Sequence, residues 1–484
     1  MPHNTDIFFF TIFIIMAVAS LVLRRVYVFV NRNSTIQNHE SHLEMHAELK
    51  TYANVFYFFA LLTVPIYAAY IVTEKFQMEP HVMEWLNLIL RWTHVVFGIA
   101  WIGASFYFIF LENSLNRTEN LRDELAGNLW AIHGGGFYYV EKYKSAPPIL
   151  PKHLHWFKYE AYFTWLSGFL LLTLVYFMNA KAMMLDSSIS NIDETTAVFI
   201  GLGSLVVGWL IYDVMCHTAL LQKKKLFGII GFAIVVLVSY ILCQFLNGRA
   251  AFILVGALMG TIMAGNVFFC IIPSQKALVA AAKANQPVNP ELGKIAGLRS
   301  LHNNYITLPV IFIMISNHFP TTFGSSFNWI ILAALTLASV AVRHYINLYE
   351  KGIYAKWMIP FATVIILSLV IVTAPKPRKL SNNSSLTKGI ISAKNLPPVK
   401  FTEIQTIFKK RCIVCHSANP TDDVNVIAPN GIKFDNAEEI QKYAERIMIR
   451  VVQTETMPQG NKTNITDAER ETIGVWIEQG AQLK

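Results

Sequence analysis

The chain has 484 residues, of which 54% are hydrophobic and only 15% are charged, and its formal net charge at pH 7 is +9. Its cysteines indicate no disulfide framework, because Cys216, Cys243 and Cys270 are scattered singly over apolar runs. The charge does not indicate a nucleic-acid partner, because the excess of Lys and Arg lies in short loops and residues 400–484 are close to neutral.

Apolar runs of about twenty residues recur through most of the chain, and such runs cross a lipid bilayer as helices. We predict about ten of these helices. They are at residues 7–23, 55–72, 86–111, 161–178, 197–216, 227–246, 250–272, 305–317, 329–342 and 357–374. The first run lacks a basic flank and a small-residue cleavage site, so it is predicted to be a retained helix and not a removed signal peptide.

Lys and Arg residues gather in alternate loops between these runs, whereas the intervening loops hold few. The basic loops contain Arg24, Arg25, Arg32 and Lys50; Arg117, Arg122, Lys142, Lys144, Lys152 and Lys158; Lys223, Lys224 and Lys225; Lys276, Lys283, Lys294 and Arg299; and Arg343, Lys351 and Lys356. Because basic loops stay in the cytoplasm, both termini are expected outside it. The prediction is a multi-pass protein of the bacterial inner membrane with periplasmic N- and C-termini.

Ionisable side chains inside a bilayer are unfavourable and therefore point to function. His94 lies in the third run, toward the periplasmic side, and Gly98 and Gly103 follow it. Glycines at this spacing allow a flat macrocycle or another helix to approach closely. We name His94 as a candidate ligand of a b-type haem, with His318 as its candidate second ligand. The alternative is a histidine hydrogen-bonded within the helix bundle.

Polar residues are more numerous toward the cytoplasmic face. They are His133, His155, Glu160, Asp213, His217, Arg299, His302, Asn303, Asn304, Arg343 and His344. Asp213 and His217 are four residues apart on one helix face, where a structural ion pair and a proton relay are equally good accounts.

The cytoplasmic loop at residues 128–162 has an unusual composition. Gly134, Gly135 and Gly136 expose backbone N–H groups that could hold an anion, although a glycine-rich turn is usually only a turn. The same loop supplies aromatic faces, imidazoles, a carboxylate and a cation, which suit a planar anionic ligand and proton transfer. These residues are Phe137, Trp156, His133, His155, Glu160 and Lys158.

The C-terminal part of the chain begins with a flexible tether at residues 375–399, rich in Lys, Asn, Ser and Pro. A small domain follows at residues 400–484, with helices predicted at 401–410 and 467–480. The predicted fold class is therefore all-α, a polytopic transmembrane helix bundle followed by a small helical class I-type cytochrome c domain.

The cytochrome prediction rests on Cys412 and Cys415, whose spacing suits two thioether bonds to haem, and on His416, which would lie under the iron. Met457 is the predicted second axial ligand, and a His/Met pair raises the reduction potential of an electron acceptor. A thioredoxin-like pair or half a zinc site is the alternative, but neither requires the adjacent histidine. Met448 competes with Met457, but it lies in a helical apolar pattern typical of a core.

Several stretches of this chain resemble one known family. They are RWTHVVFGIAWIGASFYFIFL at 91–111, LWAIHGGGFYYVEKY at 129–143, HLHWFKYEAYFTWLSGF at 153–169, LHNNYITLPVIFIMISNH at 301–318 and CIVCH at 412–416. The chain is similar here to the bacterial membrane-bound urate hydroxylases with a fused cytochrome c domain. The resemblance covers about residues 85–484 and implies a membrane urate-oxidation domain at 85–374.

The N-terminal extension at residues 1–84 departs from the family pattern. It holds two predicted transmembrane helices and three histidines, His39, His42 and His46. These histidines could bind a metal, but a solvated polar loop is the more ordinary interpretation.

The resemblance implies that urate is oxidised to 5-hydroxyisourate, with water as the oxygen source and electrons leaving through haem c. For such a substrate we assign Phe137 and Trp156 to stacking, Arg299 or Lys158 to charge, and Asn303 and Asn304 to the heterocycle edge. Proton transfer is assigned to His133, His155, Glu160 or His302.

Electrons released on the cytoplasmic side must cross a hydrocarbon layer about 30 Å thick, so an intermediate centre such as haem b is expected. A soluble cytochrome c or a terminal oxidase is the expected acceptor. Two other hypotheses remain. One is a haem c-bearing electron-transfer subunit or anchor of a respiratory complex without its own substrate site. The other is a transporter with a redox sensor, for which the sequence shows no paired repeat.

Overall fold

The computed structural model describes residues 79–118, 120–144, 146–186, 189–374, 397–422 and 428–483. The predicted helices at 7–23 and 55–72, the histidines His39, His42 and His46, and residues 375–396 of the tether lie outside the described residues. The described part is mostly helical, as predicted. It forms two compact units, each of which is built from segments far apart in the sequence.

The first unit begins with α3 (Glu79–Ser114), the hairpin β1 (Leu125–His133) and β2 (Gly136–Tyr143), and α4 (Tyr159–Leu172) up to Leu171. It continues from Gly260 in α8 (Gly248–Gly265) through η3 (Asn266–Ile271) and α9 (Ile272–Lys283) to Thr307 in α10 (Pro290–Ser316). Residues 346–354, at the end of α12 (Asn328–Tyr349), complete it.

The second unit holds the remaining apolar helices and the C-terminal domain. Its membrane part contains η1 (Thr173–Phe177), α5 (Ala180–Met183), α6 (Glu194–Cys216), η2 (Ala219–Gln222), α7 (Lys224–Phe245), α11 (Pro320–Phe323) and α13 (Met358–Val372), with parts of α8, α10 and α12. Its C-terminal part contains α14 (Phe401–Arg411), η5 (Pro429–Gly431), α15 (Ala437–Lys442), α16 (Ala444–Ile447), η6 (Met448–Gln453), η7 (Gln459–Asn461) and α17 (Asp467–Glu478).

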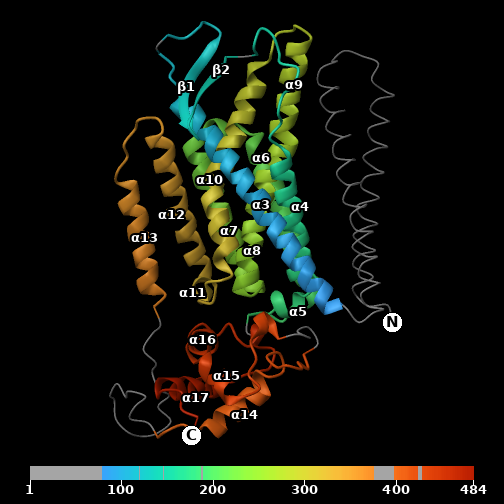
Figure 1. Cartoon of the computed structure of the whole chain (residues 1–484), viewed down its shortest axis with the longest axis vertical. Coiled ribbons are helices and arrows are strands. Elements are labelled where there is room, and N and C mark those ends of the chain that lie inside the picture. Colours follow the sequence, from blue (N-terminus) through green and yellow to red (C-terminus); the bar gives the residue numbers. More distant parts are fainter. Residues whose placement is uncertain are drawn as a thin grey trace. The chain divides into compact units, whose positions relative to one another are not determined.

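All eight apolar runs that fall on described residues are helical (Figure 1). Six helices in the described part are long and apolar enough to cross a membrane, and Met358–Val372 is a shorter apolar helix. These helices indicate membrane association. The run predicted at 305–317 is the end of a longer helix, α10, whose first half is polar.

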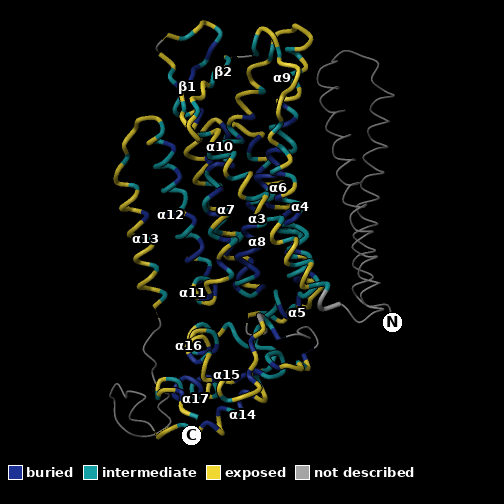
Figure 2. Tube along the Cα trace, in the orientation of Figure 1, coloured by how far each residue is buried: buried dark blue, intermediate teal, exposed yellow. Residues whose placement is uncertain are grey.

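Burial separates α8 from the other apolar helices. Ala250, Ala251, Phe252 and Leu254 of α8 have no exposed surface, whereas α3 and α13 carry many exposed apolar side chains (Figure 2). A helix that is apolar all round and enclosed by protein belongs to a core, and one with an exposed apolar surface suits contact with lipid.

The glycine-rich segment was predicted to be part of a loop. The structure instead shows an antiparallel hairpin in which His133 pairs with Gly136. Gly134 and Gly135 form its two-residue turn with φ values of 57° and 80°. Two successive positive φ values define a type I′ turn, which glycine adopts without steric strain. The prediction of an all-α chain was therefore incomplete.

The C-terminal domain has its own apolar core. Ile404 and Phe408 of α14 and Ile473 and Trp476 of α17 are almost fully buried in it. Thr466 and Glu469 form a capping box at the start of α17, in which each side chain accepts a backbone N–H of the other residue. The two helices were predicted at these positions from their start signals and apolar spacing.

Candidate functional site

Three buried polar side chains of the first unit form a connected network. The Arg299 guanidinium donates to Asn266 Oδ1 at 3.0 Å, and Asn266 Nδ2 donates to Asn303 Oδ1 at 2.8 Å. Asn303 Nδ2 donates in turn to the carbonyl of Met263 at 2.9 Å. The three side chains are at most 5% exposed. This network places a formal positive charge and two oriented amides within the apolar bundle.

The network depends on a local irregularity of the helix. Asn266 begins the π-helical segment η3, which is followed by Pro273 in the first turn of α9. Proline has no N–H and clashes with the carbonyl four residues before it, so a wider turn relieves the helix there. π-Segments recur at functional sites because they redirect side chains.

A second pair of buried amides lies in the same unit. Asn347 Nδ2 of α12 donates to Asn304 Oδ1 of α10 at 2.9 Å. Asn304 is 0% exposed and Asn347 is 4% exposed. Within the described part of the chain, Asn304 Nδ2 and Asn347 Oδ1 have no hydrogen-bond partner. Buried amide groups are nearly always hydrogen-bonded, so these two atoms mark a place that a ligand can complete.

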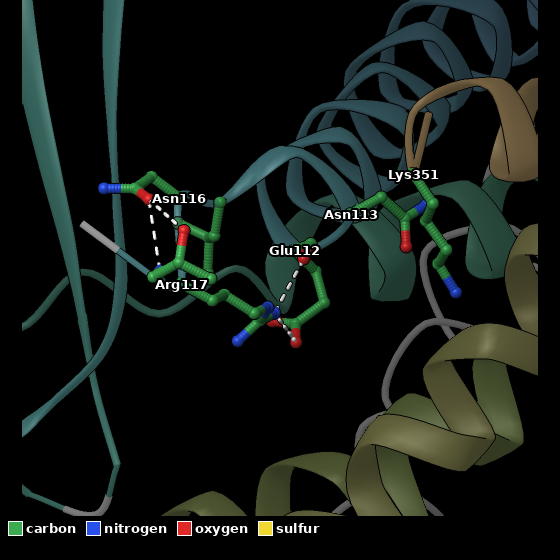
Figure 3. Close-up of a pocket in the computed structure, with 7 residues that line it drawn as sticks. Glu112, Asn113, Asn116, Arg117 and Lys351 are labelled. Carbon is green, nitrogen blue, oxygen red and sulfur yellow. Dashed lines mark hydrogen bonds and ion pairs between the residues drawn. The ribbon is translucent and has the colours of Figure 1, made fainter. Parts of the chain in front are cut away.

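A cavity of about 550 Å³ lies where α3 and α12 end (Figure 3). It is lined by Glu112, Asn113, Leu115, Asn116, Arg117, Thr118 and Lys351. Arg117 forms an ion pair with Glu112 at 2.9 Å, and Lys142 pairs with the same carboxylate. The lining itself holds two cations, Arg117 and Lys351, and one carboxylate, Glu112.

The structure places two of the predicted site residues at the tip of the hairpin. His133 is the last residue of β1 and is exposed, and Phe137 of β2 is 78% exposed. Trp130 and Tyr139 form a cross-strand aromatic pair with ring centroids 4.7 Å apart. The roles assigned to His133 and Phe137 stay predictions, and a substrate that used them would bind at the hairpin surface.

The residues predicted around α4 are in different environments. His155 is exposed, with its ring 4.5 Å from that of Phe157. Trp156 packs against the small core formed by Ala161, Val267 and Ile272. Lys158 lies over the ring of Tyr159 at 4.8 Å. Glu160 has a buried Oε2 without a hydrogen-bond partner in the described part.

His302 is partly buried on α10, three residues after Arg299 and next to Asn303. Residues three apart lie on the same side of a helix. Of the four residues assigned to proton transfer, His302 therefore shares a helix with the buried network. Sequence reasoning missed Asn266 and Asn347, although an isolated asparagine in an apolar run is itself a signal of a buried polar contact.

His94 is held by α4. Its Nδ1 lies 2.9 Å from the carbonyl of Thr164 and 3.3 Å from Ser167 Oγ. A proton on Nδ1 satisfies the carbonyl and leaves the lone pair of Nε2 for a metal, an arrangement common to metal-binding histidines. A Cβ at Gly168 would be only 2.7 Å from His94 Cε1, so this glycine makes room for the ring. His94 fits the role of a single axial ligand.

The other polar candidates are more ordinary. His318 is exposed in the second unit. His217 and Asp213 form an exposed pair at the end of α6, 3.5 Å apart, in which His217 Nδ1 also lies 2.8 Å from the Asp213 carbonyl. No group of three or more His, Cys, Asp or Glu side chains that could hold a metal ion occurs among the described residues.

The donor set of the C-terminal domain fits a covalently bound haem. Backbone hydrogen bonds from Cys415 and His416 to the Cys412 carbonyl fold the motif into a turn. The His416 Nδ1 lies 2.9 Å from the carbonyl of Ile432, which leaves Nε2 for iron. Burial lowers the pKa of His416 and raises the pKa of the Cys412 thiol to about 12. A lowered pKa favours the neutral ring, which is the form that binds a metal.

Met457 packs against the core of the same domain, together with Tyr443 and Val452. Its backbone is fixed by Arg470, whose buried guanidinium donates to the Met457 carbonyl at 2.7 Å and to the Val451 carbonyl. Met448 begins η6 and is half-buried. Met457 is therefore held by its own contacts in a loop, whereas Met448 lies within the helical region.

Comparison with known proteins gives one match. The family model described as urate oxidase N-terminal matches residues 80–374, which is more than half of the chain. No curated protein and no solved structure matches the chain. The matched range runs from the second residue of α3 through α13 and ends where the predicted tether begins.

Proposed function

This chain belongs to the urate oxidase N-terminal family, and from that premise we propose that it is a membrane-bound urate hydroxylase. The proposed reaction converts urate and water to 5-hydroxyisourate, two protons and two electrons. The oxygen comes from water, and the two electrons leave in succession through a covalently bound haem c. The chain would then act as an oxidoreductase of purine degradation in the bacterial inner membrane.

The observation that supports this proposal best is the buried network of Arg299, Asn266 and Asn303 with the neighbouring amides of Asn304 and Asn347. Urate at neutral pH is a planar monoanion with N–H and C=O groups around its edge. A buried guanidinium stabilises the negative charge, and fixed amides bind the edge without the reorganisation that water would require. Asn303 itself is engaged by Met263 and Asn266, so it holds the network in place.

The proton released as urate is oxidised needs a base within reach. We favour His302, because it shares α10 with Arg299 and the two asparagines, whereas His133 and His155 are exposed. Glu160 is the second candidate, because its buried Oε2 can accept a hydrogen bond. Trp156 and Phe137 remain the candidates for stacking, and Lys158 is the alternative to Arg299 for charge.

Haem c, held by Cys412 and Cys415 with His416 and Met457 as axial ligands, would supply a one-electron acceptor of raised potential. The chain's own contribution is to hold these ligands: Ile432 orients the imidazole, and Arg470 holds the backbone of the methionine. A soluble cytochrome c or a terminal oxidase is the proposed next acceptor, and the tether would let the domain reach it.

We include a b-type haem on His94, with His318 as the proposed second ligand, because about 30 Å of hydrocarbon is too far for one useful electron transfer. The support for it is the hydrogen bond from His94 to Thr164, which leaves Nε2 available. Acid-acetone extraction of the purified protein tests it. Release of one non-covalent haem is expected, and a protein whose haem is entirely covalent would remove this part of the proposal.

The topology is proposed with both termini in the periplasm and the hairpin in the cytoplasm. Cysteine-accessibility labelling of whole cells, with single cysteines placed in the hairpin turn and after α17, distinguishes the two sides. Labelling of both positions by the same impermeant reagent would contradict a reaction on one side of the membrane and electron collection on the other.

One assay separates this enzyme from a haem-bearing anchor without a substrate site. Urate is added without oxygen to membranes that contain the protein, and the absorbance of reduced haem c is followed. Reduction is expected in the wild type and is lost in His416→Ala. A protein whose haem is reduced by ascorbate but not by urate would contradict the enzyme proposal and support the anchor.

A further inference from the structure

We propose that the Asn304–Asn347 pair forms hydrogen bonds with an adjacent N–H and C=O on the substrate ring. The pair would in this way select cyclic ureides and oxopurines. This inference rests on the proposed function, because it names the recognition element of the same site. It also adds Asn347 as a specificity-determining residue.

The two amides are bonded to each other and incompletely satisfied. Asn347 Nδ2 donates to Asn304 Oδ1 at 2.9 Å, whereas Asn304 Nδ2 and Asn347 Oδ1 are buried without a partner in the described part of the chain. Leaving one donor and one acceptor unpaired in an apolar bundle is unfavourable, so such groups persist where binding completes them.

This conclusion does not depend on how the amide oxygen and nitrogen atoms are assigned. If both amides are rotated, Asn304 Nδ2 donates to Asn347 Oδ1, and Asn304 Oδ1 and Asn347 Nδ2 are left. In either case the pair offers one N–H donor and one carbonyl acceptor. The complementary ligand has an acceptor beside a donor, which is a lactam or urea segment.

The neighbouring amides do not offer the same recognition. Asn266 accepts from Arg299 and donates to Asn303, and Asn303 donates to the Met263 carbonyl. These bonds use both ends of each side chain. Although Asn303 and Asn304 are adjacent in the sequence, Asn303 therefore supports the site and Asn304 faces the ligand.

The position of Asn347 also suits an anionic ligand. It lies four residues before Lys351, which lines the cavity together with Arg117. Asn347 is in the last turn of α12, which ends at Tyr349, and the chain reaches the cavity lining two residues later. Asn113 at the cavity donates to Glu350 Oε2 at 2.8 Å, which fixes this end of α12 to α3. An anion bound in the cavity would therefore lie at the end of α12 whose last turn holds Asn347.

The test compares urate with a set of mono-N-methylurates, in which one N–H at a time is replaced. The full-length protein is assayed in membranes by the rate of haem c reduction, and kcat/KM is measured for each compound. We expect the wild type to reject at least one of these analogues by about 100-fold, because a site built to bind an N–H rejects the compound that lacks it.

Asn347→Leu removes the pair and is expected to reduce this rejection to less than about 10-fold while lowering kcat/KM for urate. Asn347→Asp is the second variant, which keeps the side-chain size but replaces the N–H₂ group with an acceptor. If Asn347→Leu does not accumulate in the membrane, the selectivity of Asn347→Asp between urate and the N-methylurates decides the test. Accumulation in the membrane and the midpoint of thermal unfolding in detergent verify the fold of each variant.

Thr336→Val is the matched control, because Thr336 is on the same helix, is 4% exposed and also has an unpartnered buried hydroxyl. It should keep the wild-type selectivity. The inference is wrong if the Asn347 variants keep the wild-type ratio of kcat/KM between urate and every N-methylurate. The pair then does not bind the N–H and C=O groups of the ring. A wild type that oxidises no urate at all would instead overturn the proposed function, and the inference with it.

Discussion

His94 of α3 lies so close to Gly168 of α4 that a Cβ at Gly168 would be 2.7 Å from His94 Cε1. The same imidazole is hydrogen-bonded to the Thr164 carbonyl one turn earlier on α4. A glycine and a backbone acceptor on one helix therefore fix a ring on another, as expected where glycine allows two membrane helices to approach closely.

Gly168→Ala should displace the His94 ring, because a methyl group cannot occupy that space unless the ring or its helix shifts. Overpacking of this kind destabilises proteins by about 1–3 kcal/mol. We expect a lower midpoint of thermal unfolding in detergent and, if His94 binds haem b, less extractable haem. Gly103→Ala is the control, since nothing lies within 4 Å of its added Cβ. Equal midpoints for the two variants would show that His94 is not held in this way.

If Met457 is an axial ligand of a bound haem c, as proposed, Met457→Ala should lower the reduction potential of that haem, because removal of the thioether stabilises the ferric state. The expected change is on the order of 0.1 V, within the range of about 0.8 V that axial ligands produce. Met448→Ala should leave the potential near that of the wild type, since Met448 lies within η6. Potentiometric titration of the membranes measures both, and the opposite result would assign the ligand to Met448.

Arg470→Met should weaken the attachment of Met457 to the iron without removing the ligand. The guanidinium is buried and donates to the carbonyls of Met457 and Val451, so its loss frees the loop that carries the thioether. We expect a lower potential and faster displacement of the methionine by added imidazole. Lys409→Met, which changes an exposed cation of α14, should behave as the wild type.

The C-terminal domain should lose stability in acid through Asp435. Its carboxylate accepts from Ser417 Oγ at 2.6 Å and from the Ala418 N–H at 2.7 Å. The Ser417 hydrogen bond is the main reason that the pKa of Asp435 lies below its ordinary value of 3.8. Because the pKa is lower in the folded state, the stabilisation is present above about pH 4 and is lost as the pH falls through the folded value.

Asp435→Asn should therefore be less stable than the wild type at neutral pH, and the difference should vanish in strong acid. Acid titration of the haem c absorbance in the full-length protein measures this. Glu445→Gln, at an exposed position of α16, is the control and should titrate as the wild type. A difference between Asp435→Asn and wild type that persisted at the lowest pH would refute the assignment.

Asn303→Ala should reduce both stability and turnover, because it leaves the Met263 carbonyl and the Asn266 amide without their bonds to this side chain. A buried group left in this state costs about 1–3 kcal/mol. His155→Ala should keep the melting temperature, since its ring is exposed, and reduce turnover only if it transfers protons. Full activity in both variants, with an intact haem spectrum, would show that the pocket is misplaced.

The sequence alone determined the features that depend on a few consecutive residues. Runs of apolar residues predicted every described helix that is long and apolar enough to cross a membrane, and the spacing of Cys412, Cys415 and His416 predicts haem c, which stays a prediction. The sequence also held a signal for the hairpin, because glycines between two stretches rich in strand-forming residues, at 129–132 and 137–140, favour a type I′ turn, and the loop prediction overlooked this signal.

Only the tertiary structure decided which polar side chains meet. Asn304 and Asn347 are 43 residues apart, and Arg299 reaches Asn266 across 33 residues. Such pairs depend on the rotation of each helix about its axis and on the π-segment that begins at Asn266, and neither follows from composition or local periodicity. For this reason Asn303 and Asn304, indistinguishable in the sequence, have different roles in the fold.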